Sequence, residues 1–153
     1  MISNFEIEDI AHKHKLPIVG VFSKDELPAK RKVGSYYINL QSSDDGNGTH
    51  WTFCRIFENG KAIYFDSFGA PMPQEVAKFL SIFKPIATNN RQIQDLHSEM
   101  CGWFCLALDY FFTYDAKSKD HIEEYDDFLN IWSFKTKLND KILDDYLDNK
   151  TIS

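Results

Sequence analysis

The segment that decides the fold reads Gln94-Asp95-Leu96-His97-Ser98-Glu99-Met100-Cys101-Gly102-Trp103-Phe104-Cys105-Leu106-Ala107-Leu108. Its first part is polar, and its second part is an apolar run that resumes after Asp109. A polar loop followed by an apolar run is typical of a chain that enters a buried helix, here with Cys101 at the junction. The partial positive charge at a helix N-terminus stabilises a thiolate, so Cys101 is the expected nucleophile of the chain.

Length and composition indicate one compact domain over residues 1–153. The chain holds 13 Phe, 7 Tyr and 3 Trp, enough large apolar side chains for a well-packed core. We expect an α+β fold with a central mixed sheet, packed against a buried helix that carries the nucleophile at its N-terminus. The formal net charge of −6 argues against a nucleic-acid-binding protein that works by bulk electrostatics.

The cysteine count and the hydropathy pattern bear on the compartment. Three cysteines are too few for a disulfide framework and fit a reducing compartment. The sequence contains no pattern typical of a signal peptide and no apolar run long enough to span a membrane. We therefore expect a soluble monomer that does not associate with membranes.

Periodicity predicts the elements around the cysteine helix. Ahead of it, the pattern favours a helix over residues 4–14 capped by Ser3 or Asn4, an apolar piece over 18–22, and strands over 35–40, 50–57 and 62–66. Further along, it favours a helix over 74–83, a short strand around Arg91 to Gln94, and helices over about 126–134 and 139–147.

The turn Glu58-Asn59-Gly60 between two of these strands sets a register. A two-residue loop of Asn59-Gly60 places His50 and Asp66 on opposite faces of the sheet. A three-residue loop closed by a left-handed glycine instead pairs Thr52 with Asp66, and makes His50 and Asp66 diagonal neighbours roughly 7–8 Å apart. We favour the three-residue loop because, of the two, only it lets the imidazole of His50 and the carboxylate of Asp66 meet. This choice assumes that the two residues act together and is not independent support for that role.

Four residues form a constellation suited to thiol chemistry. A thiol nucleophile needs a base, the base needs an orienting acceptor, and the oxyanion needs hydrogen-bond donors. Cys101 can attack, His50 at the start of a strand can take the proton, and Asp66 at the end of the next strand can orient the imidazole. Gln94, seven residues before the cysteine, can present its amide to the oxyanion together with the backbone N–H of Cys101.

These residues carry a resemblance to the adenovirus-type maturation proteases, which belong with the ubiquitin-like-protein proteases in one broad group. The chain resembles them in His50-Trp51, in the segment Tyr64-Phe65-Asp66-Ser67-Phe68-Gly69, in Gln94 followed after six residues by Cys101-Gly102, and in Gly20-Val21-Phe22. The resemblance covers roughly residues 18–112. Papain-like enzymes place the cysteine before the histidine, so the order here separates the two groups.

The resemblance implies a cysteine endopeptidase in which His50 is the general base, Asp66 its orienter, Cys101 the nucleophile and Gln94 an oxyanion donor. It implies viral capsid or core precursor proteins as substrates, cleavage after glycine or other small residues, and a place in the virion and the virus factory of the host cell. Members of the family use a viral peptide and DNA as activators. An activating peptide is carried over as an expectation, whereas DNA is not, because this chain is acidic.

Other interpretations of the same residues stay open. Within the same group the alternative is a deconjugating protease that acts on ubiquitin-like tails. An inactive relative that binds its former substrate as a scaffold, and an acyltransferase that delivers the acyl group to an amine, are two further readings. A zinc site built on His97, Cys101 and Cys105 lacks a fourth ligand at the usual spacing, so we expect no metal and no cofactor. We expect Cys54 and Cys105 to be core residues.

Overall fold

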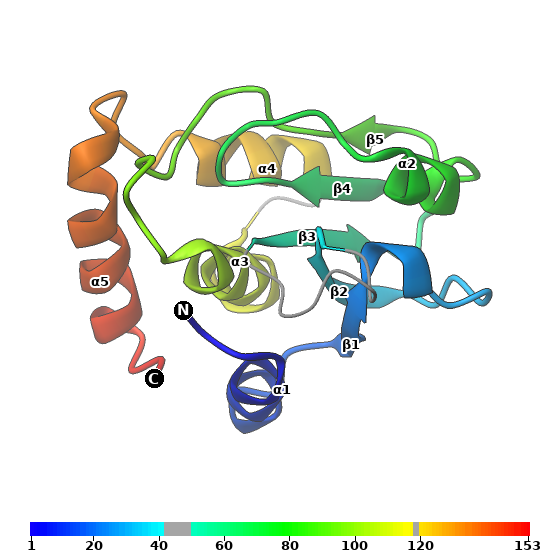
Figure 1. Ribbon diagram of the computed structural model, residues 1–153, viewed down its shortest axis with the longest axis horizontal. Helices are drawn as coiled ribbons and strands as arrows, with labels where there is room; N and C mark the ends of the chain where they lie inside the picture. The colour runs from blue at the N-terminus through cyan, green and yellow to red at the C-terminus, as the bar shows by residue number, and fades with distance from the viewer. Residues whose placement is uncertain (42–49, 118–119) are drawn as a thin grey trace.

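The computed structural model describes residues 1–41, 50–117 and 120–153, and its centre is one mixed five-stranded sheet. The strand order is β1-β2-β3-β4-β5 (Figure 1). The outer pairs β1–β2 and β4–β5 are parallel, and the inner pairs are antiparallel. The strands are β1 (Ile18–Ser23), β2 (Gly34–Asn39), β3 (Trp51–Ile56), β4 (Ala62–Phe65) and β5 (Ile86–Ala87). The α+β fold with a mixed sheet is therefore confirmed.

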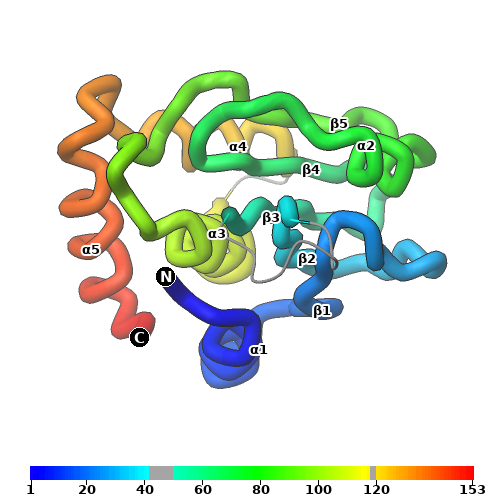
Figure 2. Tube along the Cα trace, viewed as in Figure 1, coloured from blue at the N-terminus to red at the C-terminus, as the bar shows by residue number. Residues whose placement is uncertain are grey.

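Helices surround this sheet, with α3 at the centre of the molecule between α1 and α5 (Figure 1). The tube in Figure 2 shows the N-terminus lying close to α3, and the C-terminus at the end of α5. The helices are α1 (Asn4–Lys13), α2 (Gln74–Leu80), α3 (Cys101–Tyr110), α4 (His121–Leu129) and α5 (Asn139–Asn149), with the short turns η1 (Lys24–Glu26), η3 (Phe111–Asp115) and η4 (Thr136–Leu138). In the described part of the chain, none of these helices has the length and apolarity needed to cross a membrane.

Alternation along the strands divides the core between the two faces of the sheet. One face packs against α3, α1, α4 and α5, and its buried strand residues include Tyr37, Phe53 and Phe65. The other face packs against α2 and contains Tyr36 and Cys54 among its buried residues. Because α3 is enclosed by the first cluster, nearly every residue of this helix is buried, which explains its apolar sequence.

The β3–β4 hairpin has the predicted three-residue loop. The N–H of Phe57 donates to the carbonyl of Lys61 at 2.9 Å, and Gly60 is left-handed with φ of 82°. Phe53 pairs with Phe65 in the ladder, and this register extends to Thr52 opposite Asp66 as predicted. The hairpin therefore brings His50 and Asp66 to the same end of the sheet.

A buried ion pair fastens the far end of α3 to the sheet. The Asp109 carboxylate accepts from the hydroxyls of Ser35 at 2.6 Å and Tyr37 at 2.7 Å, and lies 3.3 Å from the guanidinium of Arg55. Burial raises the pKa of Asp109, whereas Arg55 and the two hydroxyl donors lower it. These contacts prevent α3 from sliding along its axis relative to β2 and β3. They therefore also determine where the N-terminus of α3 lies.

Two predicted elements form at shifted positions. The short strand is β5 at Ile86–Ala87 and not over Arg91 to Gln94, where the N–H groups of Ile93 and Gln94 both donate to the carbonyl of Ser67. The predicted helix over 126–134 begins earlier, at His121, because Asp120 caps it by accepting from a backbone N–H at 2.9 Å, and it ends at Leu129.

Boundaries elsewhere agree to within a few residues. Ser3 caps α1 through a capping box, in which its hydroxyl accepts from the N–H of Glu6 and its own N–H donates back to the Glu6 carboxylate. The helix predicted over 74–83 ends at Leu80, and the last helix extends to Asn149.

Candidate active site

His50 and Asp66 form a close pair at the sheet end. His50 precedes β3, where its carbonyl accepts from the N–H of Leu40 at 3.1 Å, and Asp66 follows β4. The imidazole Nε2 lies 2.7 Å from Asp66 Oδ1. The Asp66 side chain is 1% exposed and that of His50 is 18% exposed, so the pair is shielded from solvent on the carboxylate side and open on the imidazole side.

Residues that the sequence reasoning did not identify hold Asp66 in place. Asn89 clamps its backbone: Asn89 Oδ1 accepts from the Asp66 N–H at 3.0 Å, and Asn89 Nδ2 donates to the Asp66 carbonyl at 2.6 Å. The N–H of Phe68 donates to Asp66 Oδ1 at 2.9 Å, and the Phe68 ring covers the imidazole with centroids 4.8 Å apart. The carboxylate of Asp66 and the imidazole ring of His50 are therefore both held in place before any ligand binds.

Cys101 lies at the N-terminus of α3, as predicted, and is 1% exposed. Its Sγ accepts from the N–H of Trp51 at 3.4 Å, and its interaction with the His50 side chain raises the pKa of that imidazole. Because Nε2 of His50 is occupied by Asp66, the ring nitrogen left for the thiol is Nδ1. The first N–H groups of a helix have no acceptor within the helix, so those at the start of α3 point toward a group bound at Cys101.

The environment of His50 favours its protonated form. Burial lowers the pKa of His50, but the hydrogen bonds and charges of Asp66 and Cys101 outweigh this effect and raise the pKa to about 9. At neutral pH the imidazole therefore holds a proton that it can share with the thiol on one side while Asp66 balances the charge on the other.

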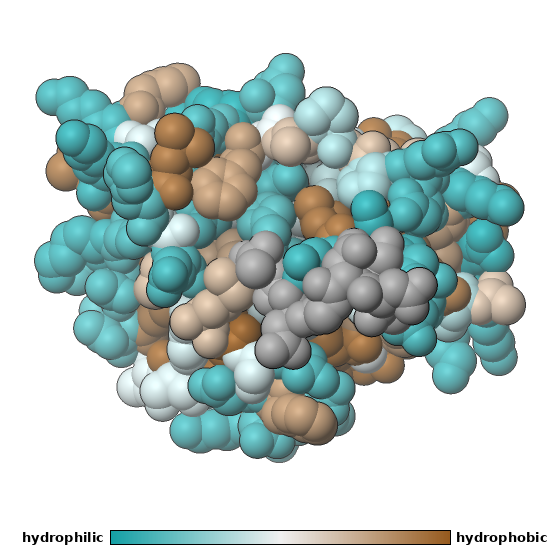
Figure 3. Space-filling model, in the orientation of Figure 1, coloured by the Kyte–Doolittle hydropathy of each residue, from teal (hydrophilic) through white to brown (hydrophobic). Residues whose placement is uncertain are grey.

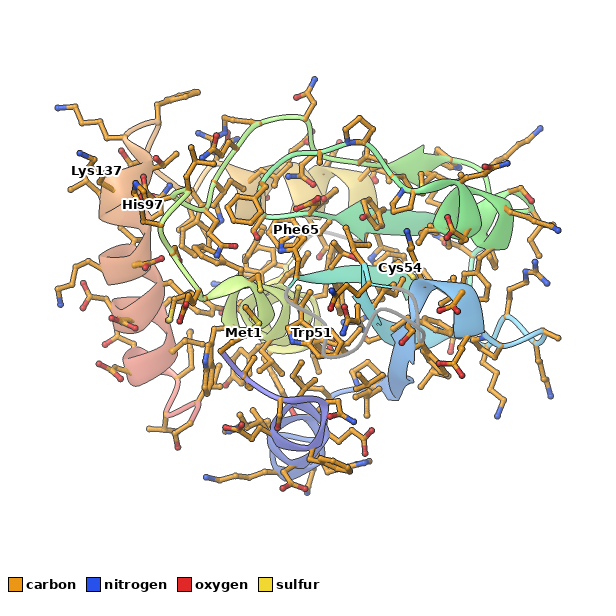
Figure 4. The ribbon with its side chains drawn as sticks, viewed as in Figure 1. Met1, Trp51, Cys54, Phe65, His97 and Lys137 are labelled. Carbon is orange, nitrogen blue, oxygen red and sulfur yellow. The ribbon has the colours of Figure 1, made fainter. Side chains whose placement is uncertain are left out.

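Gly102 has a physical reason to follow the cysteine. A Cβ on Gly102 would lie 2.2 Å from Ile2 Cγ2 and 3.2 Å from Trp51 Cδ1, both too close for an ordinary contact. Ile2 is buried against the start of α3, and its carbonyl accepts from the indole N–H of Trp51 at 3.0 Å. Figure 4 shows Met1 and Trp51 near one another at this end of α3. The chain start, Trp51 and the cysteine turn thus form one packed unit that only glycine permits.

Gln94 lies in the loop before α3 and is 1% exposed. Its Nε2 donates to the Ser98 carbonyl at 2.8 Å and to the Ser98 hydroxyl at 3.3 Å, while its Oε1 accepts from Ser67 Oγ at 2.5 Å. The Ser98 hydroxyl in turn donates to Asp140 at 2.7 Å. The amide is thus held beside the segment that leads into Cys101, with its donors directed at Ser98, and its role toward an oxyanion stays a prediction.

The other cysteines are buried among apolar side chains. Cys54 and Cys105 are both 0% exposed, and burial raises the pKa of each thiol above its ordinary value. Such thiols are poor nucleophiles. Among the three cysteines, Cys101 is the one with a base, His50, beside it. Across residues 1–41, 50–117 and 120–153, no three His, Cys, Asp or Glu side chains are arranged to hold a metal ion.

Comparisons with known proteins show the fold. No protein-family model matches the sequence, and no curated protein matches it significantly. Two crystal structures of the ASFV pS273R protease, one of them of selenomethionine protein, are similar with a TM-score of 0.57 at 16% and 15% identity, and each match covers 99% of this chain and 67% of the protease. The central domain of the uncharacterized Lpg1148 protein from Legionella pneumophila is similar with a TM-score of 0.50 at 10% identity, over 99% of this chain and 96% of that domain. The protein therefore has the fold of a viral cysteine protease.

Proposed function

We propose that the protein is a cysteine endopeptidase in which Cys101, His50 and Asp66 form the catalytic triad. The single observation that carries the proposal is the pairing of Asp66 Oδ1 with the His50 imidazole at 2.7 Å, beside a thiol at a helix N-terminus that interacts with the same imidazole. A nucleophile, a base and an orienting carboxylate in this arrangement are what acyl transfer by a thiol requires.

The reaction follows from these contacts. The Cys101 thiolate adds to the peptide carbonyl carbon while His50 holds the proton on Nδ1. Collapse of the tetrahedral intermediate breaks the C–N bond, and the imidazolium gives its proton to the departing amine. The neutral imidazole then takes a proton from water, whose oxygen attacks the thioester carbon. The C–S bond breaks, which releases the acid and restores the Cys101 thiolate beside the imidazolium. Asp66 keeps the ring in the orientation and tautomer that both steps need.

Two donors are proposed for the oxyanion: the backbone N–H of Cys101 and the side-chain amide of Gln94. Substrate would draw the Gln94 amide from the Ser98 carbonyl, because a charged acceptor binds a donor more strongly than a neutral one. We expect Gln94→Ala to lower kcat by roughly 10²–10³-fold while leaving the alkylation of Cys101 unaffected, since alkylation forms no oxyanion.

The proposed substrates are viral precursor proteins cut after glycine or other small residues, with action in the virion and the virus factory. Support comes from the motifs shared with adenovirus-type maturation proteases and from the fold shared with the ASFV pS273R protease. An activating peptide belongs to the same proposal.

Intact-mass analysis after brief exposure to iodoacetamide tests the triad. Wild type should gain one label rapidly, and Cys101→Ala should gain none, because burial raises the pKa of the Cys54 and Cys105 thiols and keeps them protonated. His50→Ala should label at the rate of an unassisted thiol. Equal labelling rates in wild type and His50→Ala would refute an activated pair. Hydrolysis of peptides with small residues before the cut completes the test, and cleavage of a ubiquitin-like fusion in their place would identify a deconjugating protease.

A further inference from the structure

Ser67, the residue that follows Asp66 of the candidate triad, holds Gln94 and its neighbour through three hydrogen bonds. Its carbonyl accepts from the N–H groups of Ile93 at 2.8 Å and Gln94 at 2.9 Å, and its hydroxyl lies 2.5 Å from Gln94 Oε1. Figure 3 shows hydrophilic and apolar side chains mixed on the face of the molecule in view, but these contacts lie beneath the surface, because Ser67 is 0% and Gln94 1% exposed. The loop that carries Gln94 is therefore anchored to the residue directly after the triad carboxylate.

The partners of the Gln94 amide determine which way each of its two ends faces. Nε2 lies 2.8 Å from the carbonyl of Ser98, and a carbonyl oxygen can only accept, so the NH₂ end of the amide faces Ser98. Oε1 then faces Ser67, and since an amide oxygen can only accept, the Ser67 hydroxyl is the donor. A hydrogen bond to the oxygen of an amide also polarises its N–H groups, which makes them stronger donors.

The contact with Ser67 matters most when the amide serves an oxyanion. To donate to the oxyanion, Nε2 must leave the Ser98 carbonyl, which is the contact that marks it as the donor end. An amide turned end for end would direct the partial negative charge of Oε1 at the oxyanion and repel it. The Ser67 hydroxyl keeps its hold on Oε1 in this step, so Nε2 stays the end that the substrate meets.

We propose that Ser67 is a positioning residue for the oxyanion site: its hydroxyl holds Oε1 of Gln94 so that Nε2 is directed at the oxyanion. The assignment rests on the proposed function, because it takes Gln94 as an oxyanion donor. Ser67 is buried against Gln94, so it acts on the reaction through that amide. Asp66 and Ser67 then join the two parts of the site, since one orients the base and the other orients the oxyanion donor.

The kinetics of Ser67→Ala test this role. The change removes the hydroxyl but keeps the carbonyl that anchors the loop. With an acetylated Gly-Gly coumarylamide as substrate, we expect kcat to fall roughly tenfold, the worth of one hydrogen bond, while KM stays the same. The rate at which iodoacetamide alkylates Cys101 should also stay the same, because alkylation forms no oxyanion.

Two further variants accompany this one. Ser67→Gly, which also lacks the hydroxyl, should behave like Ser67→Ala and serves if that variant does not fold. Ser81→Ala is the control: it removes a hydroxyl that donates to the Lys78 carbonyl at 2.8 Å, at the exposed end of α2, and it should change neither kcat nor KM.

A second change of Gln94→Ala decides whether Ser67 acts through Gln94. In the Gln94→Ala background, Ser67→Ala should lower kcat no further, because the amide that it positions is gone. A fall in kcat by the same factor in both backgrounds would overturn the proposal.

Nuclear magnetic resonance of the Gln94 side-chain amide tests the contact without turnover. The pair of amide signals that disappears in Gln94→Ala belongs to Gln94, and both signals should shift in Ser67→Ala but not in Ser81→Ala. Unshifted Gln94 signals in Ser67→Ala overturn the positioning role, whatever the activity. If the signals shift but wild type neither cleaves the peptide nor reacts rapidly with iodoacetamide, the proposed function fails, whereas the hold of Ser67 on the amide stands.

Discussion

Replacing Asp66 by Asn isolates the charge in the candidate triad. The Asn side chain keeps an oxygen at Oδ1, so it can still accept from His50 Nε2 and from the N–H of Phe68, which lie 2.7 and 2.9 Å away. The negative charge that holds the His50 proton is lost. Burial, which lowers the pKa of His50, is then opposed only by Cys101. We expect the pKa to fall from about 9 to the ordinary value of 6.5 or below.

The size of the effect follows from the pKa. The value of about 9 exceeds the ordinary 6.5 by about 2.5, which at about 1.36 kcal/mol per pKa unit corresponds to up to about 3 kcal/mol. Because the folded pKa is raised, this stabilisation is fully present below pH 6.5 and is lost as the pH rises through 9. The free energy of unfolding of Asp66→Asn should therefore be lower than that of wild type by up to about 3 kcal/mol near pH 6, and the gap should narrow above pH 9.

Two measurements check this. Nuclear magnetic resonance of the His50 ring gives its titration midpoint in wild type and in Asp66→Asn, and urea unfolding at pH 6 and above pH 9 gives the stability gap. Asp127→Asn, at an exposed position on α4, is the matched control and should change neither quantity. A His50 midpoint that differs by less than about half a unit between wild type and Asp66→Asn, or a gap that is the same at both pH values, would refute the electrostatic argument.

Three further changes test the supports of the site by urea unfolding. Gly102→Ala should lower the free energy of unfolding by about 1–3 kcal/mol, because the new Cβ would lie 2.2 Å from Ile2 Cγ2. Adding Ile2→Ala should recover part of this loss, and strictly additive losses in the double variant would contradict the contact. Asp109→Ala should lower the free energy of unfolding by about 3 kcal/mol or more, because it leaves the guanidinium of Arg55 without its buried carboxylate. A loss below about 1 kcal/mol would mean that this ion pair does not stabilise the fold. Asn89→Ala should cost about 1–3 kcal/mol, because two backbone groups lose their partners, whereas a neutral outcome would mean that water replaces the amide.

The hairpin and the cysteine helix could be predicted because local patterns determine them. The turn residues of the hairpin allow only two registers, and the three-residue one is observed. The choice between them used the need for His50 to meet Asp66, so the structure tests that need as well as the turn. Likewise the change from polar to apolar residues marks the start of α3 at Cys101 itself.

The supports of the site could not be predicted because they depend on contacts between residues far apart in the sequence. Asn89 reaches Asp66 across 23 residues, and Ser67 reaches Gln94 across 27. Neither pair has a spacing or composition that distinguishes it from an ordinary loop. The strand predicted over Arg91 to Gln94 is absent for the same reason: the N–H groups of Ile93 and Gln94 donate to the carbonyl of Ser67, a partner that only the folded chain brings close.

The Gln94 network shows how the helix at the C-terminal end bears on the candidate site. Any oxyanion at Cys101 that takes a hydrogen bond from Gln94 must compete with the Ser98 carbonyl, which already accepts from that amide at 2.8 Å. The position of Ser98 is set by its hydroxyl, which donates to Asp140 on α5 and accepts from the N–H of Met100 at 3.2 Å. A movement of α5 that released Ser98 would weaken the competing acceptor and shift the residue directly before the nucleophile. The energy needed to present the amide therefore depends on α5, although no residue of that helix belongs to the triad.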